Sequence, residues 1–183
     1  MCTLTFVPKE SGYYFAMNRD ERIARGVGTP PEKVDLAGVK AVYPRDTEGG
    51  TWIAGNDRGI AFALLNWNDV ATSARKLQSR GVVIPALLAS RSHREAQATF
   101  GRLDLKGILP FRLIGIFPAE KQAGEWRWDQ TSLSYHPHSW GNFDITKFVR
   151  RNSQVKRYVV YDQGIWRRVF SIAVNYRDNV CRC

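Results

Sequence analysis

The sequence predicts an α+β fold in which antiparallel strands form two sheets and helices cover them. Residues 3–7 alternate apolar with other side chains and residues 13–17 form an aromatic-rich run, as expected of two neighbouring strands. Residues 60–65 are apolar at every position, which indicates a strand that is covered on both sides. From Ala71 to about residue 100 the chain has a helical character. Two sheets with helical stretches between them suit a sandwich of layers.

Composition and length indicate one domain. The chain has 183 residues, 44% hydrophobic and 12% aromatic, so we expect a single domain with a substantial core over residues 1–183. No run approaches the ~18 apolar residues of a membrane span, and the N-terminus lacks the charged and apolar regions of a secretory signal. Three cysteines, at positions 2, 181 and 183, make no disulfide framework. We therefore expect a cytoplasmic protein.

The net charge of +10 comes from 27 Lys and Arg against 17 Asp and Glu. It is compatible with nucleic acid, an acidic membrane or an anionic small molecule as partner. The basic residues are scattered, and no zinc-finger spacing, aromatic RNA-binding motif or basic heptad accompanies them. We expect a solvated basic surface without a dedicated nucleic-acid site, and a small-molecule substrate or ligand that carries an anionic group.

Cys2 is the first candidate functional residue. It becomes the first residue of the chain if Met1 is removed, which a small second residue normally permits. It then carries a thiol, which ionises near pH ~8.5, beside a free α-amine with a pKa near ~7.7–8.0. Nucleophile and base are thereby joined in one residue.

A polar tetrapeptide, Asn18-Arg19-Asp20-Glu21, follows the second strand. Residues 9–12 read as a hairpin turn, so antiparallel pairing brings the tetrapeptide to the level at which Cys2 starts the first strand. A guanidinium and carboxylates at that point can fix the α-amine, lower the pKa of the thiol and bind a polar substrate group.

Strands and a loop are predicted in the next part of the chain. We expect a loop over residues 22–28 at the mouth of a pocket, because two glycines interrupt it and Thr29-Pro30-Pro31 follows. Strands are predicted over residues 39–43, 51–54 and 60–66.

Three residues between positions 52 and 80 can each have either a structural or a functional role. Asn66 ends the buried strand, where its amide either caps a turn or projects into a pocket as an oxyanion donor. Trp52 is expected to be core or pocket wall rather than a catalytic group. Arg80, at the entry to a helix, faces either the surface or a substrate.

The second half begins with a helix and returns to strands. Ser92 and Glu95 form a capping box for a helix over residues 93–100, which leaves His93 in a solvated first turn. The predicted strands cover residues 111–117, 125–129, 131–135, 158–161 and 166–174, with a turn at Gly124, a loop at residues 136–138 and a helix over residues 144–152.

Several motifs together resemble a known family. Cys2, the hairpin and Asn18-Arg19-Asp20-Glu21 are similar to the NRDE family, also called the transport and Golgi organisation protein 2 family, which is related to N-terminal-nucleophile (Ntn) hydrolases. Further matches are Gly49-Gly50-Thr51-Trp52, Gly55-Asn56, Leu65-Asn66, Ser79-Arg80-Gly81 and residues 111–116. The resemblance covers the first two thirds of the chain.

The resemblance implies a four-layer αββα sandwich of two mainly antiparallel sheets. The chain is shorter than a full family member, so we expect a sandwich shortened at its C-terminal end. The implied catalytic residues are Cys2, Arg19, Asp20 and Asn66, with Asn66 supporting the oxyanion. The implied substrate-binding residues are Asn18, Glu21, Trp52 and Arg80. Relatives in the bile-salt and penicillin acylase group separate the Arg and the acid by two residues, so Glu21 is the alternative to Asp20 as the key acid.

Two functions follow as hypotheses. The first is an N-terminal cysteine hydrolase that cleaves a nonpeptide amide or thioester through an acyl-enzyme on Cys2. The second is a non-catalytic binding or trafficking protein for haem, lipid or acyl-CoA, an association that the resemblance carries. Neither requires a metal or a cofactor for catalysis; His136 and His138, without a third ligand at fixed spacing, do not predict a metal site.

Overall fold

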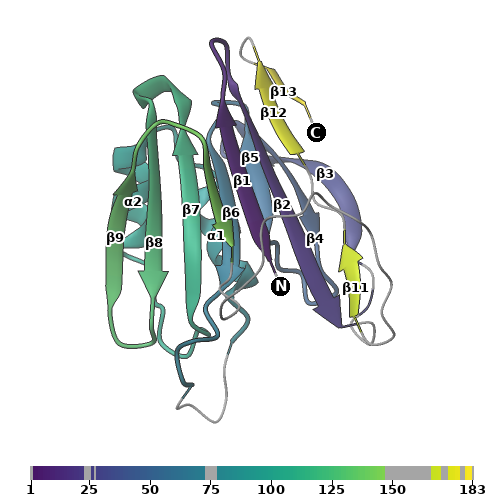
Figure 1. The fold of residues 1–183 in the computed structure, drawn as a ribbon, viewed down its shortest axis with the longest axis vertical. Helices are drawn as coiled ribbons and strands as arrows, with labels where there is room; N and C mark the ends of the chain where they lie inside the picture. The colour runs from purple at the N-terminus through teal and green to yellow at the C-terminus, as the bar shows by residue number, and fades with distance from the viewer. Residues whose placement is uncertain are drawn as a thin grey trace, which may run out of the picture.

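Two antiparallel sheets stacked face to face form the framework of the computed structural model, which describes residues 2–22, 26, 28–72, 78–146, 166–169, 173–177 and 180–182 (Figure 1). The first sheet has the order β10-β1-β2-β12-β13, and β11 also pairs with β2. Its strands are β1 (Thr3–Pro8), β2 (Tyr13–Arg22), β10 (Phe143–Thr146), β11 (Trp166–Val169), β12 (Ala173–Arg177) and β13 (Val180–Arg182). The prediction of an α+β sandwich of antiparallel sheets is confirmed.

The second sheet has the order β3-β4-β5-β6-β7-β8-β9, so its strands follow one another along the chain. They are β3 (Thr29–Leu36), β4 (Val39–Arg45), β5 (Ile53–Asn56), β6 (Ala61–Asn66), β7 (Phe111–Phe117), β8 (Gln122–Trp128) and β9 (Leu133–His138). Short 3-10 turns η1 (Arg80–Val82) and η2 (Pro118–Glu120) and helices α1 (Val83–Leu87) and α2 (His93–Phe100) complete the described elements.

The first hairpin forms as its alternation predicts. Leu4 and Phe6 are buried while their neighbours are partly exposed, and the turn closes through the Lys9 amide, which donates to the Gly12 carbonyl at 3.0 Å. Gly12 has φ of +99°, a conformation that favours glycine. Thr3 pairs with Asn18, so the next positions outward, Cys2 and Arg19, lie side by side. Strand β2 continues to Arg22, beyond its predicted end, because its last four residues pair with β11.

Apolar side chains from both sheets fill the space between them. The first sheet contributes large residues and the second contributes small and branched ones, which lets the layers pack closely. The buried set is Leu4, Phe6, Tyr13, Phe15, Met17, Ile53, Ala61, Ala63, Leu65, Ile114, Ile116 and Ala123. The other face of the second sheet packs against α1 and α2, which lie behind β6 to β9 in Figure 1. In the described part of the chain, helices cover only this outer face, so three of the four expected layers are seen.

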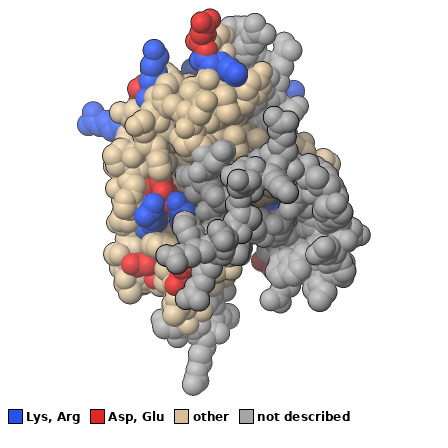
Figure 2. All heavy atoms as spheres, viewed as in Figure 1, with Lys and Arg blue, Asp and Glu red and all other residues tan. Residues whose placement is uncertain are grey.

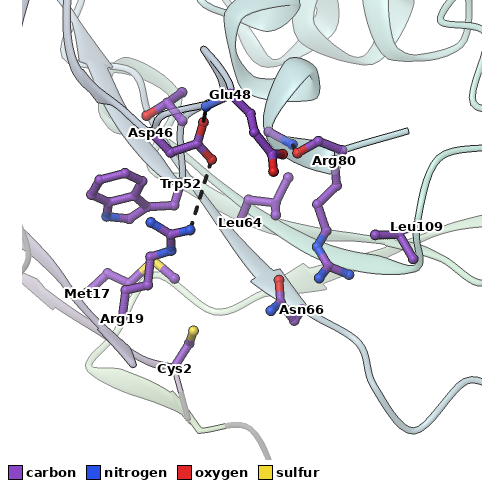
Figure 3. A pocket seen from close by; sticks show the side chains of 13 residues that line it. Cys2, Met17, Arg19, Asp46, Glu48, Trp52, Leu64, Asn66, Arg80 and Leu109 are labelled. Atoms are coloured by element: carbon purple, nitrogen blue, oxygen red, sulfur yellow. Dashed lines mark hydrogen bonds and ion pairs between the residues drawn. The ribbon is translucent and has the colours of Figure 1, made fainter. Parts of the chain in front are cut away.

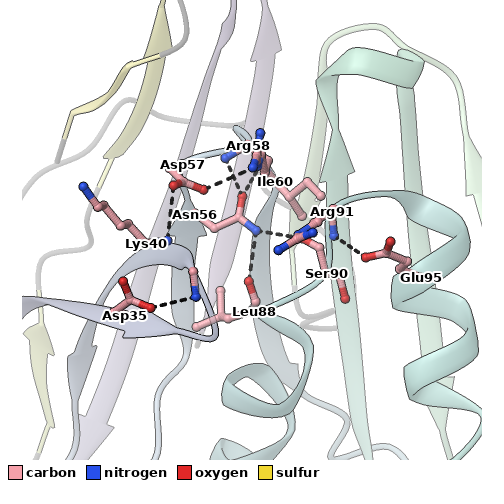
Figure 4. Close-up of polar contacts among 11 residues, drawn as sticks. Asp35, Lys40, Asn56, Asp57, Arg58, Ile60, Leu88, Ser90, Arg91 and Glu95 are labelled. Carbon is pink, nitrogen blue, oxygen red and sulfur yellow. Dashed lines mark hydrogen bonds and ion pairs between the residues drawn. The ribbon is translucent and has the colours of Figure 1, made fainter.

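Asn56 joins the turn between β5 and β6 to the segment between the two helices (Figure 4). Its side chain is 1% exposed. Oδ1 accepts from the amides of Arg58 and Ile60 at 3.1 and 3.0 Å, and Nδ2 donates to the carbonyls of Leu88 and Ser90 at 3.0 and 2.9 Å. The buried amide is therefore fully used by the fold.

Several predicted elements differ in the structure. Residues 29–36 form β3, a largely exposed strand that was not predicted. Its two prolines and its charged residues are not typical of a strand in the middle of a sheet. Gly124 lies inside β8 rather than in a turn, and it pairs with Gly115 on β7 and Pro137 on β9. The position needs a glycine because a Cβ there would clash with the Tyr135 side chain. Residues 136–138 belong to β9, where they pair with β8.

The predicted helix over residues 144–152 is wrong at its start. Residues 143–146 form β10 and pair with β1, so tertiary pairing overrides the local helical pattern. Residues 147–152, and the strand predicted over residues 158–161, lie outside the described residues. None of the described helices has the length and apolar character needed to cross a membrane.

His93 is not solvated as predicted, although α2 and its Ser92 cap are confirmed. Its ring centroid lies 5.0, 6.0 and 5.3 Å from those of Phe117, Trp126 and Tyr135. Burial lowers the pKa of His93 below 6.5, and the nearby Glu120 carboxylate offsets part of this effect.

Candidate active site

A cavity of about 300 Å³ lies where the two sheets meet at the open end of the first hairpin (Figure 3). Both sheets and the segment before α1 contribute to its wall. The lining residues are Cys2, Met17, Arg19, Asp46, Glu48, Thr51, Trp52, Leu64, Asn66, Ser79, Arg80, Gly81 and Leu109.

The first sheet supplies Cys2 and Arg19. Cys2 is 5% exposed and its sulfur points toward the centre of the group in Figure 3. Cζ of Arg19 lies 4.4 Å from the centroid of the Trp52 ring, and Nη2 lies 4.0 Å from Oδ2 of Asp46. A cation–π contact on one side and an ion pair on the other therefore hold the guanidinium next to Cys2.

The loop that begins at Asp46 is fixed by its own hydrogen bonds. Oδ1 of Asp46 accepts from the amides of Glu48 and Gly50 at 3.0 and 2.8 Å, and the Asp46 amide donates to the Gly50 carbonyl at 2.7 Å. Gly49 takes a φ of +81° within this turn. Asp46 was not predicted as a site residue. The sequence from Asp46 to Gly50 is typical of an Asp-capped turn, but it does not predict the contact with Arg19.

Two glycines bring the segment around Arg80 against this loop. A Cβ on Gly50 would lie 2.9 Å from Cα of Gly81, so no larger residue fits at that crossing. The Thr51 amide donates to the Gly81 carbonyl at 3.1 Å, and the Ser79 hydroxyl accepts from the Gly81 amide at 3.4 Å. Backbone contact thus fixes this wall of the cavity.

Asn66 and Arg80 line the wall opposite Cys2 in Figure 3. Arg80 Nη1 donates to the Pro110 carbonyl at 2.8 Å. The side-chain amide of Asn66 makes no hydrogen bond to any described residue, so within this part of the chain it does not cap the end of β6. The buried indole N–H of Trp52 likewise has no partner among the described residues, which leaves a donor to be satisfied.

The remaining predicted residues lie elsewhere. Asn18 is not among the lining residues, because strand residues alternate between faces and it stands between Met17 and Arg19. The backbones of Asp20 and Glu21 belong to β2, while their side chains lie outside the described part of the structure. Of the predicted set, Cys2, Arg19, Trp52, Asn66 and Arg80 line one cavity.

Charges of both signs meet in the cavity. Arg19 and Arg80 provide two cations, and Asp46 and Glu48 provide two carboxylates. Across the described residues, no three His, Cys, Asp or Glu side chains gather in a way that could hold a metal ion. The arrangement offers a thiol, an amide donor and guanidinium groups around one small volume, the parts needed for acyl transfer.

Two Ntn hydrolases, a bile acid hydrolase and a penicillin V acylase, are among the solved structures with a similar fold. Two variants of the conjugated bile acid hydrolase from Clostridium perfringens match with TM-scores of 0.55 and 0.52 at 13% and 11% identity, each over 90% of this chain and 63% of the hydrolase chain. Penicillin V acylase from Agrobacterium tumefaciens matches with a TM-score of 0.49 at 12% identity, over 75% of this chain and 49% of its own.

The likeness to the bile acid hydrolase is one of fold, and the chain spans less than two thirds of that protein's length. No curated protein sequence matches the chain. The model of the family Transport and Golgi organisation 2 matches residues 1–158, which is most of the chain. The chain therefore belongs to the transport and Golgi organisation 2 family.

Proposed function

We propose that this protein is an N-terminal cysteine hydrolase that cleaves a nonpeptide amide or thioester through an acyl-enzyme on Cys2. One observation carries the proposal: Cys2, Arg19 and Asn66, which are distant in sequence, line the same cavity. The Ntn-hydrolase fold of the chain supports a hydrolytic function in general.

The first half of the reaction forms the acyl-enzyme. After removal of Met1, the α-amine of Cys2 takes the proton of its thiol, and the sulfur attacks the substrate carbonyl carbon. The side-chain amide of Asn66 donates to the oxyanion that develops. The carbon–nitrogen or carbon–sulfur bond then breaks, and the leaving group takes the proton back from the α-ammonium.

The second half releases the product. The α-amine accepts a proton from water, and the resulting hydroxide attacks the thioester carbonyl. The carbon–sulfur bond to Cys2 breaks, the thiolate recovers its proton, and a carboxylic acid leaves. Nucleophile and base remain the same residue in both halves.

Arg19 stabilises the thiolate in this proposal, because a guanidinium beside a thiol lowers the pKa of that thiol. An acid on β2 orients the α-ammonium. Asp20 and Glu21 are the two candidates for this acid. Asp20→Asn and Glu21→Gln variants separate these two candidates.

The cavity favours a small, polar acyl donor. Its volume of about 300 Å³ lies at the lower end of the ~300–1,000 Å³ typical of small-molecule sites. Arg80 can pair with an anionic group of the substrate, and the face and N–H of Trp52 can contact the rest of it. A whole haem or acyl-CoA is larger than this cavity.

A second candidate is a binding or trafficking protein that carries haem, lipid or acyl-CoA without turnover. The burial of Cys2, which is 5% exposed, favours it, because an enclosed sulfur is poorly placed to meet a substrate. In this alternative the cavity holds one polar group of a larger ligand.

Intact-protein mass spectrometry with a thiol-directed acylating probe tests the proposal. We expect loss of Met1 and an adduct on Cys2 that forms faster than on Cys181 and Cys183, and no such adduct in Cys2→Ser. Retained Met1, together with a Cys2 no more reactive than the other two cysteines, would contradict the hydrolase. A ligand that copurifies with the protein would then support the second candidate.

A further inference from the structure

Four charged or titratable side chains form a cluster on the face of the second sheet that is turned toward the first sheet. Arg112 comes from β7, Glu125 and Arg127 from β8, and His138 from β9; we call them the charged cluster. They lie on the same face as Ile114 and Ala123, which belong to the core between the sheets. Figure 2 shows basic and acidic atoms together at mid-height in the left half of the view, where Figure 1 shows β7 and β8.

The two arginines stand directly opposite each other on neighbouring strands. Arg112 pairs with Arg127 in the register of β7 and β8. Like charges in directly opposite positions destabilise a sheet unless something else compensates for them. The cluster must therefore contain or attract negative charge.

Glu125 supplies one negative charge, and its carboxylate is fully occupied. It is 0% exposed. Oε1 accepts from Nε of Arg112 and from Nε of Arg127, the latter at 2.8 Å; Oε2 accepts from Nη2 of Arg127 at 2.9 Å and contacts Nε2 of His138 at 3.2 Å. Four contacts use the acceptor positions that a carboxylate offers.

The charge of the cluster is not balanced within the described part of the chain. There, Glu125 is the one carboxylate within ion-pair distance of either guanidinium. Two positive charges face one negative charge when His138 is neutral. A purely structural ion pair needs one arginine for one carboxylate, and the second arginine is in excess.

The excess arginine has donors that reach solvent. Nη1 and Nη2 of Arg112 and Nη1 of Arg127 make no hydrogen bond to described residues, and the two side chains are 21% and 32% exposed. Glu125 holds both guanidinium groups by their Nε atoms. The Nη1–Nη2 pair of Arg112 and the remaining Nη1 of Arg127 can donate to the oxygens of a carboxylate or phosphate.

We propose that the charged cluster binds an oxyanionic group, a carboxylate or a phosphate, with Arg112 and Arg127 as the residues that contact it. The site is separate from the cavity at Cys2 and does not depend on the proposed hydrolase activity. His138, whose ring stacks on Phe143 at a centroid distance of 5.1 Å, forms one side of it.

Titration of the full chain with sodium phosphate or sodium acetate, at constant ionic strength set by sodium chloride, tests this site. The Nε–H signals of the arginines, followed by NMR in isotope-labelled protein, report binding at each side chain. We expect saturable shifts at Arg112 and Arg127 with at least one of the two anions. The anion that binds more tightly tells phosphate from carboxylate.

Variants separate specific binding from general charge attraction. Arg112→Lys keeps the ion pair with Glu125 and loses the fork, so it should fold normally and bind about tenfold more weakly, the loss expected for one charge-assisted hydrogen bond. Arg102→Gln removes an equal charge from an exposed position outside the cluster and should bind as the wild type does. Unsaturable shifts with both anions, or equal affinity of Arg112→Lys and the wild type, would overturn the proposal.

Discussion

Arg19 and Asp46 form an ion pair that crosses from the first sheet to a loop of the second, with Nη2 and Oδ2 4.0 Å apart. Both side chains are largely buried, at 13% and 9% exposure, so solvent screens the pair less than it would at the surface. The residue beside Cys2 in the first sheet is thus oriented by a residue that the second sheet supplies.

Asp46→Asn should reduce the reactivity of Cys2 while the fold persists. The amide oxygen can still accept from the amides of Glu48 and Gly50, but its N–H₂ group now faces the donors of Arg19. We expect the rate of adduct formation at Cys2 to fall about tenfold, the equivalent of one charge-assisted hydrogen bond. Asp35→Asn, at an exposed position near the end of β3, is the control and should leave this rate unchanged.

Asn66→Ala should affect chemistry far more than stability. Removing one oxyanion donor costs ~2.7–4 kcal/mol of transition-state stabilisation in other enzymes, while the Asn66 amide makes no hydrogen bond in the described part of the fold. The measurements are turnover of a model thioester and the melting temperature. A large fall in melting temperature with unchanged turnover would assign Asn66 to the fold instead.

Asn56→Ala should destabilise the protein by about 3 kcal/mol or more, because three buried hydrogen bonds to the backbone and one part-buried one are lost at once. Urea unfolding of the variant measures the free energy directly. Asn68→Ala, at an exposed position after β6, is the matched control. Equal stability of the two variants would mean that water replaces the lost contacts of Asn56.

The contacts of Glu125 predict that the free energy of unfolding decreases in acid. Burial alone would raise its pKa, but hydrogen bonds from His138, Arg127 and Arg112 lower it well below the ordinary 4.5. As the pH falls, Glu125 therefore takes up a proton in the unfolded chain before it does so in the folded one. Its contribution to the free energy of unfolding is complete above about pH 4.5 and is lost as the pH falls toward the pKa of the folded state. Thermal melts in steps below pH 6 should show a shallower decline for Glu125→Gln. Parallel declines would contradict this role.

His93 predicts a second, milder pH effect. Because burial lowers its folded pKa below 6.5, the unfolded chain takes up the proton more readily, and stability falls as the pH drops through about 6.5. His93→Phe retains an aromatic ring beside Phe117 and Trp126 and cannot titrate. Its melting temperature should change less than that of the wild type between about pH 8 and pH 5.5.

Local sequence patterns predicted the first hairpin and the buried strand β6, because alternation and an unbroken apolar run are properties of consecutive residues. These patterns failed where pairing with a distant strand determines the secondary structure. Residues 144–146 have a helical pattern but form a strand because they pair with β1. Strand β3 was missed because an exposed edge strand lacks the apolar alternation on which the prediction relied.

The same distinction applies to the candidate site. Cys2, Arg19, Trp52, Asn66 and Arg80 could be chosen from sequence because they belong to short motifs. Asp46 could not, since its importance comes from a partner on the other sheet. The charged cluster was missed for the same reason: Arg112 and Arg127 face each other only once β7 and β8 are paired.

Because the cavity has walls from both sheets, any molecule held there adds a link between two layers that are otherwise joined by apolar packing and by a few polar contacts, such as the Arg19–Asp46 ion pair and the hydrogen bond from the Tyr13 hydroxyl to the Gly59 carbonyl. Separating the layers would then require its release. When a ligand is bound, the backbone amides of β2 and of β6 should therefore both exchange with solvent more slowly than in the free protein, although these strands do not pair with each other. Such joint protection gives a ligand screen that needs no knowledge of the reaction.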